Sequence, residues 1–397
     1  MRAKESRRRQ LGNSTLSVHA GEDRHGRKPL TTEIAQTSVF TLPGLDELRR
    51  ISEGKSDAYM YTRYANPTTR AAELKIAALE GAEDCLVTAS GMAATASAVF
   101  SQCSAGDEIV SMLDVYGGTL KLFDDTLKRF GVSVRCVAYK DLGNLERSIT
   151  RHTRMLFLES PTNPTLRCVD LERLCAIGRR HKLCVVVDNT FATPILQKPL
   201  ELGADLVMHS ATKYLGGHSD VTAGALAGSK RLIDGARTSM KQVGGCLDPG
   251  ASYLLLRGIK TLEIRVERAC QNAAAVAEAL LGHEKVERVM YPGFENCDGH
   301  EFAKRQMRDF GMMVSFEIRG GERAADRFIN ALELWYLATS LGGVESTVSY
   351  PALSSHIGLS KERLKLMDVT AATVRLSVGI ENPDDLAADL LQALDRA

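Results

Sequence analysis

Lys213 stands in a stretch whose residue types suit covalent chemistry on a carbonyl group. It follows the apolar run from Leu206 to Met208 and is flanked by Ser210 and Thr212, and a pair of glycines follows it. Burial lowers the pKa of a lysine, and a neutral amine can form a Schiff base with an aldehyde. The same stretch also fits a lysine that simply reaches solvent at the end of a strand. Other segments must decide between the two interpretations.

Two more strand ends carry groups that suit a flat, phosphorylated ligand. The residues from Ser90 to Ala93 are small and open a predicted helix, where free N–H groups attract anions and Gly91 lets a phosphate approach. Tyr116 precedes two glycines and offers an aromatic face with room around it. A tyrosine that closes a turn in the core would have the same pattern, and serine–glycine turns are common.

Polar side chains follow two further predicted strands. Pro161 and Pro164 frame Asn163 in a rigid turn, and Asp188 comes directly after three valines. A carboxylate there is costly to bury unless it meets a cation, although it could also cap a helix. The interval from Asp188 to Lys213 leaves room for one helix and one strand, which places the two residues at the ends of neighbouring strands.

These groups together fit pyridoxal 5′-phosphate. The helix N-terminus supplies phosphate donors, Tyr116 a stacking face and Lys213 the amine. Asp188 would keep the pyridine nitrogen protonated, so that the ring can act as an electron sink.

The elements that must position these residues alternate along the chain. Near-continuous apolar runs separated by helical patterns predict an α/β fold with a mostly parallel sheet covered on both faces. Ligands bind at the carboxyl ends of such strands. The expected strands are Cys85–Thr88, Glu108–Leu113, Val132–Tyr139, Arg154–Glu159, Leu183–Asp188 and Leu206–His209.

The periodic pattern divides the chain into three parts. Residues 1–65 have few periodic signals and are predicted to form an N-terminal arm. Residues 66–250 would form the cofactor-binding α/β domain, and residues 251–397 a smaller α+β domain that begins with a long helical stretch, Ala251–Leu281.

Composition excludes several classes of protein. The chain has 397 residues and a formal net charge of +1, so nothing global indicates nucleic acid or an anionic membrane surface. No apolar run is long enough for a transmembrane helix. Nine scattered cysteines without a C-x-x-C pair argue against disulfides and zinc, and we expect no metal and a reducing, cytoplasmic location. The basic start, Met1 to Gly12, is not a secretory signal and is interpreted as a solvated tail.

Six segments resemble one known family in the family's own order. The chain is similar to the Cys/Met-metabolism family of pyridoxal-phosphate enzymes, which includes cystathionine γ-synthase, cystathionine γ-lyase, methionine γ-lyase and O-acetylhomoserine sulfhydrylase. The resemblance implies the fold of aspartate aminotransferase, called fold type I. The matching segments are Tyr61 to Thr68, Ser90 to Ala93, Tyr116 to Thr119, Glu159 to Thr165, Asp205 to Ser219 and Ser340 to Ser346.

The resemblance implies a role for each matching residue around the cofactor ring. Lys213 would form the Schiff base and move protons, and Asp188 would pair with the pyridine nitrogen. Asn163 would bind the ring hydroxyl, and Tyr116 would stack on the ring and assist proton transfer.

Further roles concern the phosphate, the substrate and a partner subunit. Arg375 would bind the α-carboxylate of a small amino-acid substrate, with Ser340 close by. Family members are usually homotetramers built from dimers that share active sites. The residues implied at the phosphate are Gly91, Met92, Ser210 and Thr212 of one chain and Tyr61 and Arg63 of its neighbour.

Departures from the family pattern bear on the substrate. Members that handle cystathionine commonly carry acidic residues where this chain has Met60 and Thr339, and bacterial methionine γ-lyases often carry a cysteine at Gly118. A buried ammonium group without a partner is penalised, so cystathionine is disfavoured. The usual Met-Thr-His is replaced by Ser354, Ser355 and His356, which points to an unusual γ-substituted amino acid.

Three hypotheses follow. The first is γ-elimination on a methionine-like γ-substituted amino acid, which gives a 2-oxo acid and ammonia. The second is γ-replacement, in which an activated homoserine reacts with a thiol or sulfide. The third is a catalytically silent cofactor-binding protein on the same scaffold, because a fold alone does not fix function.

Overall fold

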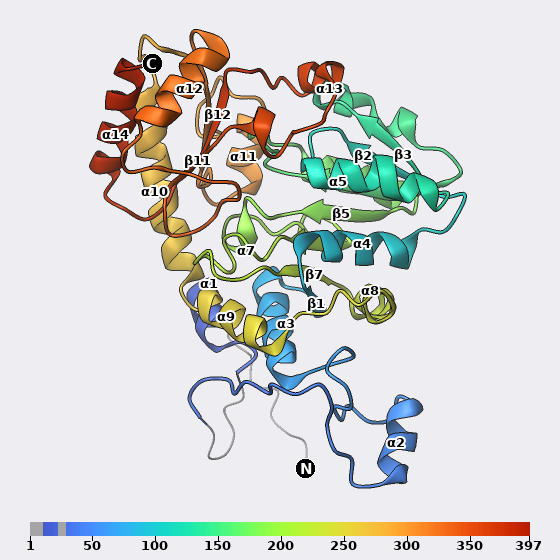
Figure 1. Ribbon diagram of the computed structural model, residues 1–397. Helices are drawn as coiled ribbons and strands as arrows, with labels where there is room; N and C mark the ends of the chain where they lie inside the picture. The colour runs from blue at the N-terminus through green and yellow to red at the C-terminus, as the bar shows by residue number, and fades with distance from the viewer. Residues whose placement is uncertain (1–10, 23–28) are drawn as a thin grey trace.

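The computed structural model describes residues 11–22 and 29–397 of the chain (Figure 1). Most of the basic segment at the start of the chain therefore lies outside the described residues. Two sheets organise the rest, a larger one in the first two thirds of the chain and a smaller one in the last third.

The larger sheet is mostly parallel, as the sequence predicts. Its strand order is β1-β7-β6-β5-β4-β2-β3, and among these strands only β7 runs against its neighbours. The strands are β1 (Asp84–Thr88), β2 (Glu108–Met112), β3 (Ser133–Val137), β4 (Thr153–Glu159), β5 (Cys184–Asp188), β6 (Leu206–His209) and β7 (Gly224–Gly228). The six strands expected from the sequence all form, and β7 is the addition.

Helices cover both faces of this sheet because its strands are apolar on both sides. In β1, Leu86 packs into one core cluster, while Cys85 and Val87 pack into the other. The first cluster includes side chains of α4 (Gly91–Gln102), α5 (Gly117–Lys121), the π-helical η1 (Leu122–Leu127), the 3-10 helix η2 (Tyr139–Ser148), α6 (Leu171–Arg180) and α8 (Lys230–Val243). The second includes side chains of α3 (Pro67–Glu80), α7 (Thr193–Leu196) and α9 (Pro249–Ile259).

The smaller sheet has the order β10-β11-β12-β9-β8 and its own core. The helix α10 (Leu262–Leu280) joins the two parts, since its first half packs in the second cluster of the large domain and its second half in the core of the small one. The other elements are β8 (Val286–Met290), α11 (His300–Gln306), β9 (Met313–Ile318), α12 (Gly321–Ala331), β10 (Tyr336–Leu337), β11 (Thr347–Ser349), η3 (Pro351–Leu353), α13 (Lys361–Leu366), β12 (Thr373–Ser377) and α14 (Pro383–Asp395).

The predicted helical stretch Ala251–Leu281 is two helices, not one. Arg265 explains the break, because its guanidinium donates to the carbonyl of Gly258 at 2.8 Å and to that of Tyr214 at 2.9 Å. A Cβ on Gly258 would lie 2.1 Å from the carbonyl oxygen of Gly216, so this end of α9 packs directly on the turn that follows Lys213. The end of α9 is therefore fixed by the segment that carries the lysine.

The N-terminal region contains two helices that were not predicted from the sequence. The first, α1 (Asn13–His19), contacts α3 and α10. The fully buried Lys75 of α3 donates to the carbonyls of Ser17 and Val18 at 2.9 and 3.0 Å, which suits the negative end of a helix dipole. The second, α2 (Leu45–Ser52), stands apart from the rest of the molecule (Figure 1). Where each of the three predicted parts begins and ends stays a prediction.

Candidate active site

One cavity of about 540 Å³ collects every predicted site residue except Tyr61 and Arg63. It lies where β4, β5 and β6 end, beside the N-terminus of α4, and β12 of the smaller sheet contributes Arg375 to it. This is the edge at which parallel sheets bind ligands. The predicted residues in its lining are Gly91, Met92, Tyr116, Asn163, Asp188, Ser210, Thr212, Lys213, Ser340 and Arg375.

The N-terminus of α4 forms an anion site in this cavity. Ser90 caps the helix, because its Oγ accepts from the backbone N–H of Ala93 at 3.1 Å. The N–H groups of Gly91 and Met92, in the first turn, are left without partners inside the helix. A Cβ on Gly91 would lie 2.9 Å from the Cβ of Ser210, so glycine is what lets the serine hydroxyl approach the helix end. These donors and the helix dipole suit a phosphate group.

The hydroxyl of Thr212 already forms hydrogen bonds with the backbone of Ala223. It donates to the carbonyl of Ala223 at 3.1 Å and accepts from the N–H of the same residue at 2.9 Å. Its single proton is therefore occupied in this rotamer. The predicted contact between Thr212 and a phosphate stays a prediction that requires the side chain to rotate.

Two buried carboxylates lie side by side at the ends of β4 and β5. Glu159 and Asp188 are directly paired across these strands. Burial raises the pKa of Asp188, although its Oδ1 accepts from the N–H and the hydroxyl of Thr190 at 3.0 and 2.5 Å. Burial and the neighbouring Asp188 raise the pKa of Glu159 further above its ordinary value. A positively charged ring nitrogen beside Asp188 is the partner that such a pair lacks.

Arg375 and Asn163 meet in the same cavity. The Nη1 of Arg375 donates to the side-chain oxygen of Asn163 at 2.7 Å, and its Nη2 donates to the carbonyl of Ser340 at 3.2 Å. The Nε is buried without a hydrogen-bond partner among the described residues. Burial lowers the pKa of Arg375 to about 10, so the side chain is still charged at neutral pH. An incoming carboxylate would satisfy the unpaired Nε.

Lys213 has the electrostatics that an amine nucleophile needs. Burial, assisted by the nearby charge of Arg375, lowers the pKa of Lys213 from 10.5 to about 8. Its Nζ donates to the hydroxyl of Ser340, whose backbone has a positive φ of 86°. A Cβ on Gly342 would lie 2.7 Å from the backbone nitrogen of Tyr214, so the segment around Ser340 packs against the lysine's own backbone.

Tyr116 lies at the mouth of the cavity with 43% of its surface exposed. Its backbone N–H donates to Glu159 at 2.8 Å, which ties its turn to the end of β4. A Cβ on Gly118 would lie 2.4 Å from the ring of Tyr116. The glycine that replaces the family's frequent cysteine therefore leaves space for this position of the ring.

Tyr61 and Arg63 do not join the other predicted residues within one chain. Arg63 lines a separate cavity of about 460 Å³, and Tyr61 packs against Arg63. There the guanidinium of Arg63 lies 5.3 Å from the ring centre of Tyr61 and 4.9 Å from that of Tyr64, and it donates to the carbonyl of Lys241. Their predicted contact with a phosphate in a neighbouring subunit stays a prediction.

Sequence reasoning assigned no role to three other groups that line or adjoin the site. Glu159 supports the turn of Tyr116, and Thr190 holds Asp188. His356 is buried, which lowers its pKa to about 4, and its Nδ1 lies 2.8 Å from the hydroxyl of Ser355. Their location along the chain was the only evidence in the sequence for a place in the site, because Glu159 and Thr190 lie at strand ends that also carry predicted site residues.

Two further findings concern metal binding and membrane-spanning helices. In residues 11–22 and 29–397, no group of three or more histidine, cysteine, aspartate and glutamate side chains is arranged to hold a metal ion. No helix in the same part of the chain is long and apolar enough to cross a bilayer.

The fold and the site together define a pyridoxal-phosphate-dependent α/β enzyme. The anion site at α4, the buried carboxylate of Asp188, the amide of Asn163 and the amine of Lys213 face one cavity, and they fit the phosphate, ring nitrogen, hydroxyl and aldehyde of that cofactor.

Comparison with known proteins identifies the family. Residues 14–395 match the family described as Cys/Met metabolism PLP-dependent enzyme, and the chain belongs to it. It is 44% identical to an L-methionine gamma-lyase of Fusobacterium nucleatum subsp. polymorphum over 98% of this chain and 99% of that protein. It is 43% identical to cystathionine gamma-synthase 1, chloroplastic, of Arabidopsis thaliana over 96% of this chain and 69% of that protein.

A solved structure has the same fold. The cystathionine gamma synthase of Xanthomonas oryzae pv. oryzae, in complex with aminoacrylate and cysteine, superposes with a TM-score of 0.91 at 36% identity and covers 97% of this chain and 98% of that chain. The predicted family, fold class and cofactor are thereby confirmed. The enzyme acts on a small amino acid with pyridoxal phosphate as its cofactor.

Proposed function

We propose that this enzyme catalyses γ-elimination on a methionine-like amino acid, in which the γ-substituent leaves and water completes the release of a 2-oxo acid and ammonia. The observation that carries the proposal is the charge of the cavity lining. Among the described residues, its only carboxylates are Glu159 and Asp188, which lie together at the ends of β4 and β5.

The remaining lining is uncharged where a substrate side chain would extend. Thr339, Leu341 and Leu353 lie there beside Ser340. A distal ammonium group such as that of cystathionine would find no counter-charge and would lose its hydration. An uncharged thioether loses little by entering the same space. The 44% identity to a protein named L-methionine gamma-lyase supports the same choice.

Substrate binding would depend on Arg375 and Ser340. The unpaired Nε of Arg375 and the hydroxyl of Ser340 lie on the same side of the cavity as Asn163. Together they would hold the α-carboxylate and orient the Cα–H bond toward Lys213. Orientation of this kind converts an encounter into a reaction within one complex.

Proton transfer would belong to Lys213 and Tyr116. Bound pyridoxal phosphate supplies an aldehyde that condenses with amines and a ring that stores electrons. Lys213, as the free neutral amine that its lowered pKa favours, would take the proton from Cα, release it, and then take one from Cβ. Tyr116 would stack over the ring and assist as the γ-substituent departs. Asp188 would hold the proton on the ring nitrogen.

We also propose a homotetramer built from dimers, in a cytoplasmic location. The arm before residue 66 exposes the large apolar side chains of Leu30, Val39 and Leu45, with 96%, 60% and 68% of their surfaces accessible. Apolar surface of this extent is favourable to cover. In the tetramer, Tyr61 and Arg63 would reach the phosphate held by α4 of the neighbouring chain.

γ-Replacement is the second candidate. It is favoured by the 43% identity to a cystathionine gamma-synthase and by the likeness to a solved one. The holoenzyme, incubated with methionine and with O-acetylhomoserine, with and without a thiol, separates the two. We expect 2-oxo acid from methionine without added thiol. Formation of a thioether amino acid that depends on the thiol, with no oxo acid, would establish γ-replacement instead.

A further inference from the structure

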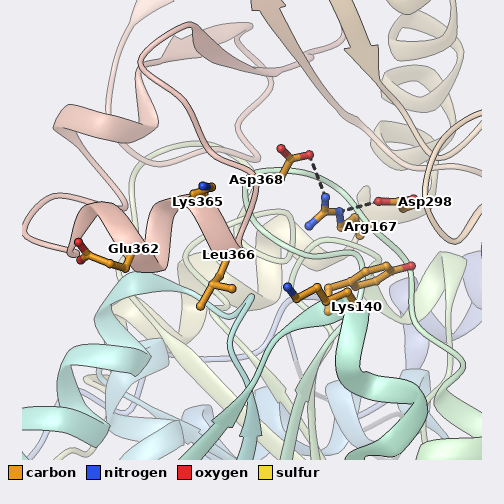
Figure 2. A pocket seen from close by; sticks show the side chains of 8 residues that line it. Lys140, Arg167, Asp298, Glu362, Lys365, Leu366 and Asp368 are labelled. Carbon is orange, nitrogen blue, oxygen red and sulfur yellow. Dashed lines mark hydrogen bonds and ion pairs between the residues drawn. The ribbon is translucent and has the colours of Figure 1, made fainter.

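A further cavity separates the two domains on the side of Arg167 (Figure 2). Its volume is about 740 Å³. Lys140, just after β3, lies on one side of it, and Lys365 and Leu366 of α13 lie on the other. Met367 and Val369 pack into the first core cluster beside this space, and polar contacts bridge the space itself.

Arg167 makes those contacts from the large domain. Its Nε donates to Asp298 and its Nη2 to Asp368, each at 2.9 Å, and Figure 2 shows both pairs. Its Nη1 lies 3.4 Å from the carbonyl of Met367. The side chain is only 13% exposed, and its guanidinium lies 5.1 Å from the ring centre of Tyr139. A fork of donors that pairs with two carboxylates is a geometry that arginine, but not lysine, provides.

Arg167 is also fixed to its own domain. Its Nη1 lies 3.5 Å from Asp114, whose side chain is 1% exposed. Burial raises the pKa of Asp114 to about 6, and the charge of Arg167 opposes this rise. The backbone N–H of Arg167 donates to the hydroxyl of Thr162 at 3.0 Å, and its carbonyl accepts from the N–H of the same residue at 2.9 Å. Arg167 therefore closes the turn of residues 162–167.

The same turn carries Asn163. One end of the turn thus meets the small domain through Asn163 and Arg375, at 2.7 Å, and the other end meets it through Arg167 and Asp368. Asp368 lies in the short connection between α13 and β12, which is the strand that carries Arg375. A shift of this connection relative to the turn would move the guanidinium of Arg375 relative to Asn163.

We propose that Arg167 is a positioning residue for substrate recognition, which holds β12 against the turn of residues 162–167 and so aims Arg375 at the α-carboxylate. The inference rests on the proposed function, because it assumes that Arg375 binds that carboxylate. Arg167 itself lines the cavity between the domains and is not among the residues that line the candidate active site.

The test compares two ligands in the holoenzyme, methionine and 3-(methylthio)propylamine, which is the same molecule without its carboxylate. Each dissociation constant is measured from the change in cofactor absorbance, before products accumulate. In Arg167→Met we expect the preference for the amino acid over the amine to fall about tenfold, in line with typical coupling between linked sites. The affinity for the amine should stay within about twofold of the wild type, since the amine does not use Arg375.

A matched control removes a different bridge between the domains. Arg363 of α13 binds Asp124 of η1 through both terminal nitrogens, the second at 3.1 Å, and neither residue contacts the turn of residues 162–167. Arg363→Met should leave the ligand preference unchanged, even if it lowers the unfolding temperature as much as Arg167→Met does. Arg167→Lys should restore only part of the preference. The ammonium group keeps the positive charge, but it cannot pair with both Asp298 and Asp368 as the guanidinium does.

Three results would contradict the inference. One is an unchanged preference in Arg167→Met, and another is an equal loss in Arg363→Met, which would indicate general loosening of the domains. If Arg167→Met does not fold, Asp368→Asn removes the charge of the same pair, together with that of the pair between Asp368 and Arg288 at 2.6 Å, and must also lower the preference. A wild type that binds the amine as tightly as the amino acid would refute the role of Arg375 and with it that of Arg167. A fall in preference in an enzyme that releases no oxo acid would support the inference and contradict only the proposed reaction.

Discussion

The lowered pKa of Lys213 leads to a prediction about how the apoprotein takes up its cofactor. Only a neutral amine attacks an aldehyde. With a pKa of about 8, roughly a quarter of the Lys213 side chains are neutral at pH 7.5, whereas an ordinary lysine with a pKa of 10.5 would be neutral in about one molecule in a thousand. The fall in pKa therefore raises the concentration of the reactive form by a factor of more than about a hundred.

The assay follows imine absorbance after apoprotein is mixed with pyridoxal phosphate between pH 6.5 and 10. Nα-acetyl-lysine, measured in parallel, corrects for the ionisation of the cofactor itself. The rate for the protein should rise toward pH 8 and then level off while the reference keeps rising, so the ratio of the two rates should be constant below pH 8 and fall above it. Borohydride reduction followed by mass analysis should locate the adduct at Lys213. A protein profile that rises in parallel with the reference up to pH 10 would refute the lowered pKa.

Replacement of Arg375 by glutamine tests the cause of the shift. Burial is the larger cause and the charge of Arg375 the smaller one, so the midpoint of the rate profile should move upward but stay below pH 10.5.

The lowered pKa of Lys213 also makes the stability of the folded protein depend on pH. A lysine whose pKa is lower in the folded protein destabilises it fully below pH 8, and this cost, at most about 3 kcal/mol, disappears as the pH rises from 8 to 10.5. Lys213→Met should remove this dependence from denaturant unfolding of the apoprotein.

Four further substitutions test the site. Lys213→Ala should abolish turnover and leave the circular dichroism spectrum unchanged; full activity would contradict its role. Gly91→Ala should weaken cofactor binding by at least about tenfold in equilibrium dialysis, because the new methyl group meets Ser210. An unaltered dissociation constant would argue against a phosphate at α4. Asp188→Asn should lower kcat by at least about a hundredfold and alter the cofactor's absorption spectrum; a wild-type rate would contradict its pairing with the ring nitrogen. Arg63→Ala should weaken cofactor binding about tenfold through the partner subunit, a prediction that wild-type affinity would overturn.

The residues predicted on the cofactor side of the site lie together in one cavity because they are local to strand ends. The interval between Asp188 and Lys213 indicated neighbouring strands, and Asp188 in β5 is indeed paired with Met208 in β6. The predicted phosphate donors Gly91 and Met92 follow β1, and Asn163 follows β4. A parallel sheet brings such ends to one edge whatever the loops between them do, so identifying the strands was enough to bring the residues together.

The strand β7 shows why part of the larger sheet was missed. Its sequence, GALAG, has neither the β-branched residues nor the alternation of a typical strand. The structure explains the small side chains. A Cβ on Gly224 would lie 2.1 Å from the carbonyl of Ser90, and one on Gly228 would lie 2.6 Å from the carbonyl of Asp205. Close packing against these backbone carbonyls requires small residues, and glycine and alanine are residues that a propensity scale disfavours in strands.

Arg375 was assigned to the site only through the family resemblance. The pairing of strands in the smaller sheet explains why the local sequence did not indicate it. Arg375 faces Ser315 of β9 and Ser349 of β11 across the neighbouring strands. These small residues leave room for a guanidinium that is only 3% exposed, and Ser315 in turn donates to the carbonyl of Pro164 at 2.6 Å. An arginine inside an apolar strand is costly unless register supplies both space and acceptors. Register between strands many residues apart cannot be read from local sequence, and long-range pairs such as Arg167 with Asp368 depend on it equally. The residues predicted to bind the cofactor are therefore set by each strand on its own, whereas the predicted recognition of the substrate's carboxylate depends on how the two domains fit together.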